Sequence, residues 1–285
     1  MGHPLHGPNR FKLGIFAANA DGGLALTRVP ERWPARWPEI VEVAQMADRA
    51  GIEFFLPIAR WKGFGGETNS REWSFETLTF AAALAGVTER IGLFSTVHVP
   101  MIHPVYAAKA LSTVDHASGG RAGLNIVCGW NPSEFDLFGL DMIQDRYAQG
   151  LEWVEVMERL FAGGPPFDYE GRFYRLRGVS GLPVPVQRPR PVTLNAAFFS
   201  GRARLRRADG GFFVHDVHRH RSRPRTRGGY GAAVAIDGSV HDLPCRMPLN
   251  AGGGRRLLRA LRGDDGRPRR GGLSYGGEAA VLRLA

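Results

Sequence analysis

Short apolar runs alternate with longer stretches of helical periodicity over the first two thirds of the chain. Apolar runs of strand length occupy residues 11–19, 52–58, 91–97, 122–127 and 192–197, and residues 211–213 begin a sixth. Amphipathic or alanine-rich stretches predict helices over residues 36–50, 75–86, 104–118 and 146–161, with a shorter helix over 203–208. Ser74 is expected to cap the second helix, and residues 129–145 are expected to form an irregular loop. Nearly continuous apolar strands that alternate with helices predict an α/β fold with a parallel sheet covered by helices.

The strand over residues 122–127 is the most informative of these segments. Gly119 and Gly120 precede it and suit the end of a helix, where a left-handed residue is needed. The strand contains one polar residue, Asn125, among apolar neighbours. A buried polar side chain needs a partner, which is either another side chain or a ligand. Because parallel sheets and barrels place their chemistry at the carboxyl ends of the strands, Asn125 is a candidate ligand contact.

Other polar residues follow the ends of predicted strands. Arg60 comes after the second strand, Glu134 lies in the loop after the fourth, and Arg146 and Tyr147 begin the next helix. Taken alone, Arg146 or Glu134 is most simply explained as a charged residue on the surface. Together they would converge on one face of a parallel barrel. Arg146 and Tyr147 at a helix N-terminus would suit an anion such as a phosphate.

Several other classes of site have little support. The glycine-rich segment over residues 63–66 lacks the third glycine of a dinucleotide fingerprint, so a loop over the sheet is the better interpretation. His215, His218 and His220 have metal-like spacing, but only Asp216 accompanies them, and we expect no metal site. The part of the sequence with alternating strands and helices, residues 1–213, contains no Gly-x-Ser-x-Gly elbow, which argues against a hydrolase.

The two cysteines cannot form a disulfide framework, and a reducing, cytoplasmic location is expected. The first twelve residues have no apolar core, so no signal peptide is expected there. No apolar run approaches the length of a membrane span.

The net charge of +10 is distributed unevenly. Residues 1–200 contain 19 Lys and Arg against 20 Asp and Glu, whereas residues 201–285 contain 18 Arg, no Lys and 7 Asp and Glu. The entire basic excess therefore lies in the last 85 residues, where the alternation of strands and helices also ends.

Several segments together resemble the bacterial luciferase-like flavin-dependent monooxygenases. They are residues 119–131, Glu134, residues 145–147 and residues 167–173, and the resemblance covers about residues 11–213. The pyrimidine, dimethyl sulfone and alkanesulfonate monooxygenases form the most similar branch, and residues 62–66 match the pyrimidine type in particular. The family fold is a TIM-type (β/α)8 barrel, which agrees with the alternation described above.

The resemblance implies an FMN cofactor and a set of residues that contact it. By matching position, these residues are Ala59, Arg60, Asn125, Glu134, Arg146, Tyr147 and Ser200. The match of Ser200 rests on a segment that is one residue shorter than the family pattern. The implied reaction uses reduced FMN from a separate flavin reductase, together with O2, to oxygenate a small pyrimidine or organosulfur substrate. No catalytic acid or base is assigned, and a homo-oligomer is expected if the barrel is complete.

The barrel expected from this sequence is incomplete, because the last strands and helices of the family are missing. We therefore divide the chain into a barrel portion over residues 1–213 and an irregular Arg/Gly-rich segment over residues 214–285. A frameshift would explain the second part. Codons can be chosen so that residues 241–249 and 250–262, read one base later, give a strand and an amphipathic helix like those of the family.

An incomplete barrel exposes edge strands and apolar helix faces, so the chain is expected to be poorly soluble or inactive. Two alternatives to the monooxygenase stay open. One is a truncated, inactive barrel whose arginine-rich segment binds nucleic acid, although that segment lacks Lys and has few aromatic residues for base stacking. The other is a deazaflavin-dependent oxidoreductase, since related barrels bind that cofactor.

Overall fold

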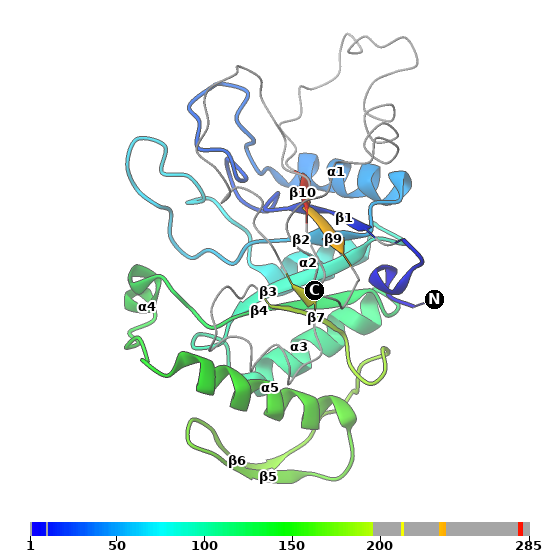
Figure 1. Ribbon diagram of the computed structural model, residues 1–285, viewed down its shortest axis with the longest axis vertical. Helices are drawn as coiled ribbons and strands as arrows, with labels where there is room; N and C mark the ends of the chain where they lie inside the picture. Colours follow the sequence, from blue (N-terminus) through cyan, green and yellow to red (C-terminus); the bar gives the residue numbers. More distant parts are fainter. Residues whose placement is uncertain (1, 10, 196–211, 214–233, 238–278, 282–285) are drawn as a thin grey trace, which may run out of the picture.

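The structure is a computed structural model that describes residues 2–9, 11–195, 212–213, 234–237 and 279–281 (Figure 1). Its main sheet has eight strands in the order β10-β1-β2-β3-β4-β7-β8, and β9 also pairs with β1. The strands of this sheet are β1 (Phe11–Phe16), β2 (Phe54–Leu56), β3 (Gly92–His98), β4 (Ala122–Val127), β7 (Val192–Asn195), β8 (Phe212–Phe213), β9 (Val234–Asp237) and β10 (Ala279–Val281). The helices are α1 (Trp37–Ala50), α2 (Thr77–Ala85), α3 (Pro104–Ala117), α4 (Pro132–Leu137) and α5 (Arg146–Ala162), with a 3-10 turn η1 (Pro4–His6) at the start.

The parallel sheet expected from the sequence is confirmed. Every neighbouring pair from β1 to β8 in the sheet order is parallel, and the short β8 continues it beside β7. The hairpin expected over residues 167–176 forms as β5 (Phe167–Glu170) and β6 (Arg175–Val179). The helix expected over residues 203–208 lies outside the described residues.

The other edge of the sheet departs from a (β/α)8 barrel. Both β9 and β10 pair with β1 in the antiparallel direction. A TIM barrel closes through parallel strands only, so these two strands do not occupy the positions of its later strands. The part of the chain that the structure describes is therefore a curved, open half-barrel.

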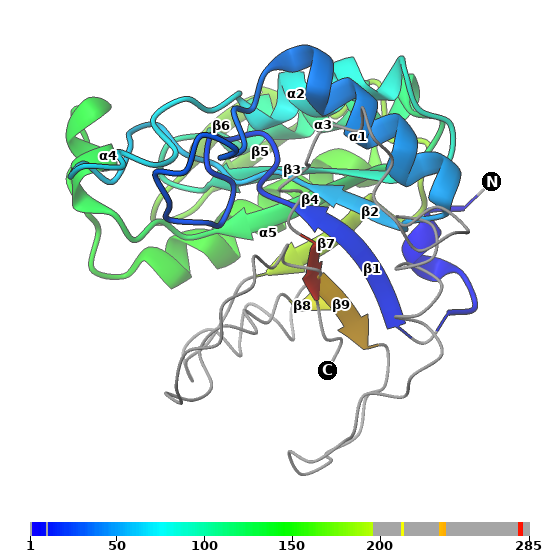
Figure 2. The same ribbon diagram turned by 90° about the horizontal axis from the view of Figure 1, so that it is seen from above.

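Alternate residues of each strand face opposite sides of the sheet. Phe55, Leu93 and Leu124 belong to the large cluster between the sheet and its helices. Phe54 and Phe94 belong to a smaller cluster with Leu5 on the concave side. Figure 2 shows α1 and α2 along the convex side of the sheet. The curvature gives the sheet two distinct ends, at which the chain places different polar groups.

The glycines at the helix ends act as expected. Gly51 ends α1 with φ 76°, and Gly119 and Gly120 leave α3 with φ 64° and 87°. These left-handed conformations are cheap for glycine and strained for other residues.

Two local expectations were wrong. Glu76, not Ser74, caps α2, because its carboxylate accepts the backbone N–H groups of Leu78 and Thr79. The segment over residues 129–145 is not wholly irregular, because it contains the short helix α4. A six-residue helix is too short to show a clear periodicity in the sequence.

The amino ends of the strands are closed by a buried arginine. The Arg121 guanidinium donates to the carbonyl oxygens of Ser118 at 2.8 Å, Ile91 at 2.8 Å and Thr88 at 2.9 Å. Nearby, the Asp48 carboxylate accepts the N–H groups of three successive residues, 89–91, at 2.6 to 3.0 Å. These bonds satisfy the backbone where α2 turns into β3.

The first residues cover the concave side at this same end. The His3 ring packs edge-on against Phe94 with centroids 5.5 Å apart, and Leu5 is buried. A Cβ atom at Gly92 would lie 2.7 Å from the His3 ring. The close approach of His3 to β3 therefore requires glycine at position 92.

Candidate functional site

At the carboxyl ends of the strands, Arg60 and Glu134 form a buried ion pair. Arg60 Nε lies 3.3 Å from Glu134 Oε1, and the two side chains are 5% and 1% exposed. The same Oε1 atom accepts the backbone N–H of Trp61 at 3.1 Å. Burial lowers the pKa of Arg60 from its ordinary value and Glu134 opposes this shift, so the guanidinium stays charged. Glu134 is therefore not a charged surface residue, which was the simplest explanation for it alone.

Helix α4 explains why Glu134 points inward. Asn131 caps the helix by accepting the N–H of Ser133 at 3.2 Å, and Pro132 occupies the first turn. Phe135 is buried and fixes the helix against the strand ends. Glu134 lies next to Phe135 in this helix, and its carboxylate points toward the loop that follows β2, where it accepts the Trp61 N–H.

Aromatic residues join the two loops above this ion pair. Arg60 Cζ lies 4.2 Å from the centroid of the Phe64 ring and 5.4 Å from that of Trp130. Trp61 and Phe138 pack edge to face with centroids 4.9 Å apart. The segment over residues 63–66 is therefore a loop, as expected, and Arg60 holds it through a cation–π contact.

Asn125 is buried on the concave side of β4 as a candidate ligand contact should be. Its Nδ2 donates to Thr96 Oγ1 at 3.2 Å, and Thr96 Oγ1 donates to the Pro57 carbonyl oxygen at 2.5 Å. The Asn125 Oδ1 atom is buried and has no hydrogen-bond partner among the residues that the structure describes. A buried acceptor without a partner is costly, so it marks a position where a ligand can donate a hydrogen bond.

His98 ends β3 and was not identified from the sequence. Its Nδ1 atom lies 3.9 Å from Glu134 Oε2, and its side chain is 4% exposed. Burial, with a smaller contribution from Arg60, lowers the pKa of His98 to about 4, so the ring is neutral at pH 7. The sequence signal was present, because His98 follows an apolar strand just as Arg60 does.

A cavity of about 110 Å³ lies beneath these groups. Its lining includes Ala59, Arg60, Thr96, His98 and Ile102. Pockets for small organic ligands usually measure roughly 300 to 1,000 Å³, so this cavity can take only part of a cofactor. The rest would lie over the open side of the strand ends.

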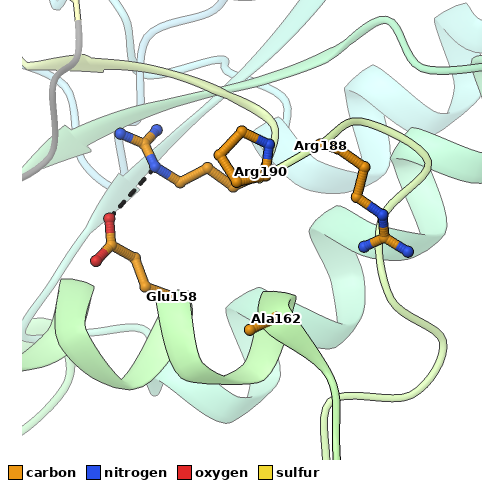
Figure 3. A pocket seen from close by; sticks show the side chains of 5 residues that line it. Glu158, Ala162, Arg188 and Arg190 are labelled. Carbon is orange, nitrogen blue, oxygen red and sulfur yellow. Dashed lines mark ion pairs between the residues drawn. The ribbon is translucent and has the colours of Figure 1, made fainter.

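Larger hollows lie on the outer surface, away from these groups. One of about 480 Å³ separates α5 from the segment over residues 188–190, where Arg190 Nε pairs with Glu158 Oε1 at 3.3 Å (Figure 3). A second, of about 440 Å³, runs between α5 and the β5–β6 hairpin. Neither contains a residue that the sequence placed in the site, and the smaller internal cavity remains the candidate.

The remaining expected residues are less closely connected. Arg146 and Tyr147 begin α5 on the side where β4 ends (Figure 1). Arg146 contacts Met142 Sδ at 3.9 Å and lies 5.3 Å from the centroid of the Tyr147 ring. Ser200 lies outside the described residues.

The residues present fit an FMN molecule in two respects. The free Asn125 Oδ1 can accept a hydrogen bond from a ring N–H group. Arg146 stands in the first turn of a 17-residue helix, where a phosphate is favoured. Within the described ranges, no group of three or more His, Cys, Asp or Glu residues could hold a metal ion. None of the described helices is long and apolar enough to cross a membrane.

Comparison with known proteins identifies the family. The family described as luciferase-like monooxygenase matches residues 11–223. Pyrimidine monooxygenase RutA of Bradyrhizobium sp. is 32% identical over 180 residues, which are 62% of this chain and 50% of the relative. The RutA of Pseudomonas syringae pv. syringae is 32% identical over 177 residues, 61% of this chain and 49% of the relative. The chain thus spans about half the length of the curated relatives that it matches.

Solved structures agree with this assignment. Monooxygenase RslO1 from Streptomyces bottropensis is 30% identical with a TM-score of 0.51, covering 56% of this chain and 47% of that one. EDTA monooxygenase (EmoA) from Chelativorans sp. BNC1 is 24% identical with a TM-score of 0.61, covering 72% and 55%, and shows the likeness of fold alone. The expected resemblance is confirmed: this chain belongs to the luciferase-like monooxygenase family.

Proposed function

We propose that the chain carries the flavin site of an FMN-dependent monooxygenase that oxygenates a small organic substrate with O2. A separate flavin reductase would supply the reduced cofactor. The observation that carries the proposal is Asn125 Oδ1, a buried acceptor that has no partner within the described part of the chain, on a strand whose carboxyl end also carries the Arg60–Glu134 pair. Membership of the luciferase-like monooxygenase family gives the reaction class.

Each residue would have a role that its environment supports. Asn125 would accept a hydrogen bond from the flavin ring, and Arg146 and Tyr147 would hold the phosphate at the start of α5. Arg60 and Glu134 would form the wall of the site and, with Trp61 and Phe64, exclude water from it. Bound reduced flavin would supply the reaction with O2, while the protein binds and orients.

Flavin titration tests this proposal. We expect the purified full-length chain to quench FMN fluorescence, and Asn125→Ala to weaken the affinity about tenfold, as for one buried hydrogen bond. Ser95→Ala is the matched control, because Ser95 donates to the Thr77 carbonyl on the helix side of β3. Absence of FMN binding by a folded wild-type chain would contradict the proposal. Binding of a deazaflavin in place of FMN would support the deazaflavin-dependent alternative.

The substrate proposal is a pyrimidine or an organosulfur compound. The named function of the relatives favours the pyrimidine. Turnover assays with a flavin reductase and each substrate class would distinguish the two. Oxygenation of neither would reject both classes.

The division of the chain at residue 213 is also a proposal. We propose that residues 214–285 are the product of a frameshift, as their arginine excess and lack of Lys suggest. Sequencing the gene across codons 208–219 tests this directly. An intact frame would reject it and would leave nucleic-acid binding by the basic segment to be tested by a salt-dependent gel shift.

A further inference from the structure

We propose that His98 is a positioning residue of the site, which holds the Glu134 carboxylate from the β3 side in its Nδ1–H tautomer. This inference rests on the proposed flavin site. Residues at or just after the ends of β2 and β3 would then both hold one carboxylate, that of Glu134 after β4. Neither the family match nor the expected FMN contacts assign a role to this histidine.

The two oxygens of Glu134 are used differently. Oε1 receives both the Trp61 N–H and the Arg60 guanidinium, at 3.1 and 3.3 Å. Oε2 faces His98 Nδ1 at 3.9 Å. Without His98, the carboxylate would be held from one side only and could rotate away from the loop that it anchors.

The surroundings of the ring determine its tautomer. Among the described residues, His98 Nδ1 is buried without a hydrogen-bond partner, and it lies 3.9 Å from Glu134 Oε2, an acceptor. A lone pair on Nδ1 would repel the carboxylate, whereas a proton there is attracted to it. The separation of 3.9 Å is longer than a hydrogen bond, so the two groups attract each other electrostatically. A small rotation of either side chain would shorten this distance to that of a hydrogen bond.

The charge balance also favours a neutral ring. Arg60 already compensates Glu134, and a second positive charge would lie close to the guanidinium. A protonated His98 would therefore weaken the pair that it supports. Burial and the nearby Arg60 guanidinium both lower the pKa of His98, so the ring stays neutral.

Substitutions can separate positioning from simple packing. His98→Asn keeps a polar atom near the position of Nδ1, His98→Gln keeps one near Nε2, and His98→Phe fills the space alone. The control is His103→Asn, because the His103 ring accepts the Val105 N–H as the cap of α3, a role that Asn also performs well.

Three measurements on the full-length chain test the proposal. Nitrogen-15 NMR of labelled histidine is expected to show a neutral Nδ1–H ring for His98 at pH 7. Trypsin cleavage after Lys62, followed by mass spectrometry, reports release of the loop after β2, and we expect several-fold faster cleavage in His98→Gln and His98→Phe. FMN affinity is expected to fall about tenfold in these two variants. His98→Asn and the control should stay within about twofold of wild type.

The outcomes are distinguishable from those of the proposed function. If the wild type binds no FMN, the proposed function fails, while the NMR and cleavage results still decide the role of His98. If FMN binds but all three His98 variants behave alike, the residue only packs and the inference fails. A protonated or Nε2–H ring would also overturn it.

Discussion

The two ends of the sheet each bury an arginine, and the two arginines differ in how completely they are satisfied. Arg121 at the amino end donates to carbonyl oxygens of four residues and to the Thr88 hydroxyl. Among the described residues, the Arg60 guanidinium at the carboxyl end has one hydrogen bond, to the Lys62 carbonyl at 3.2 Å, while its Nε has only the ion pair with Glu134. A buried charge whose donors are all satisfied stabilises a fold, whereas one with unsatisfied donors is available to a ligand. We therefore expect changes at the amino end to affect stability and changes at the carboxyl end to affect binding of the proposed flavin.

The largest expected effect is that of Arg121→Met. The change leaves several buried carbonyl oxygens without donors, and we expect the free energy of unfolding to fall by about 3 kcal/mol. Urea denaturation measures this. FMN affinity of the remaining folded protein should not change, and a loss of affinity would show that the two ends are not independent.

A smaller loss of stability is expected for Asp48→Ala, about 2 kcal/mol, because three N–H groups lose their acceptor. Burial raises the pKa of Asp48, but the backbone donors outweigh it and hold the pKa below its ordinary value. The stabilisation is therefore present above about pH 4 and is lost as the pH falls through the lowered pKa. Denaturation curves of wild type and variant between pH 3 and 7 should converge at the acid end; parallel curves would contradict this.

For the double variant Arg60→Met/Glu134→Gln we expect a loss of stability of only about 1 kcal/mol, together with a tenfold or greater loss of FMN affinity. Arg60→Met alone leaves Glu134 buried without its countercharge and should cost about 3 kcal/mol, most of which Glu134→Gln in the same chain should recover. Thermal unfolding and flavin titration, run on both variants, give the two numbers. A stability loss in the double variant equal to that of Arg121→Met would contradict the comparison.

The last expected effect is absent at pH 7 and is a pH dependence that both ends share. Burial lowers the pKa of His3 at the amino end to about 3 and that of His98 at the carboxyl end to about 4, from an ordinary 6.5. Each ring is neutral in the folded protein. Its contribution to the free energy of unfolding is therefore complete above pH 6.5 and declines as the pH falls toward the lowered pKa. His3→Asn and His98→Asn should each flatten the fall in stability between pH 6.5 and 4. An unchanged slope in either variant would show that its ring is not buried neutral.

Sequence patterns predicted the elements better than the contacts between them. The bounds of β4 and the left-handed conformation after α3, at Gly119 and Gly120, were predicted correctly. A short apolar run between glycines is compatible with few other structures. Asn125 was recognised as exceptional for the same reason. By contrast, the Arg60–Glu134 pair joins residues that are far apart in sequence. The positions of both residues after strand ends, and the family resemblance, placed them on one face of the sheet, but neither predicted the ion pair.

The role of Arg121 could not be predicted, since its acceptors are backbone carbonyl oxygens, which every residue carries. His98 lay one residue beyond the predicted strand and so was not considered. Short helix α4 depended on its cap and on Phe135 rather than on periodicity. Ser200 and the division at residue 213 stay predictions.

The packing of His3 against Gly92 has an evolutionary consequence. Any side chain at position 92 would collide with the imidazole, while a smaller residue at position 3 would leave a space that such a side chain could fill. Positions 3 and 92 should therefore vary together among relatives that keep this amino-terminal segment. A homologue with alanine at position 92 should lack the histidine ring at position 3.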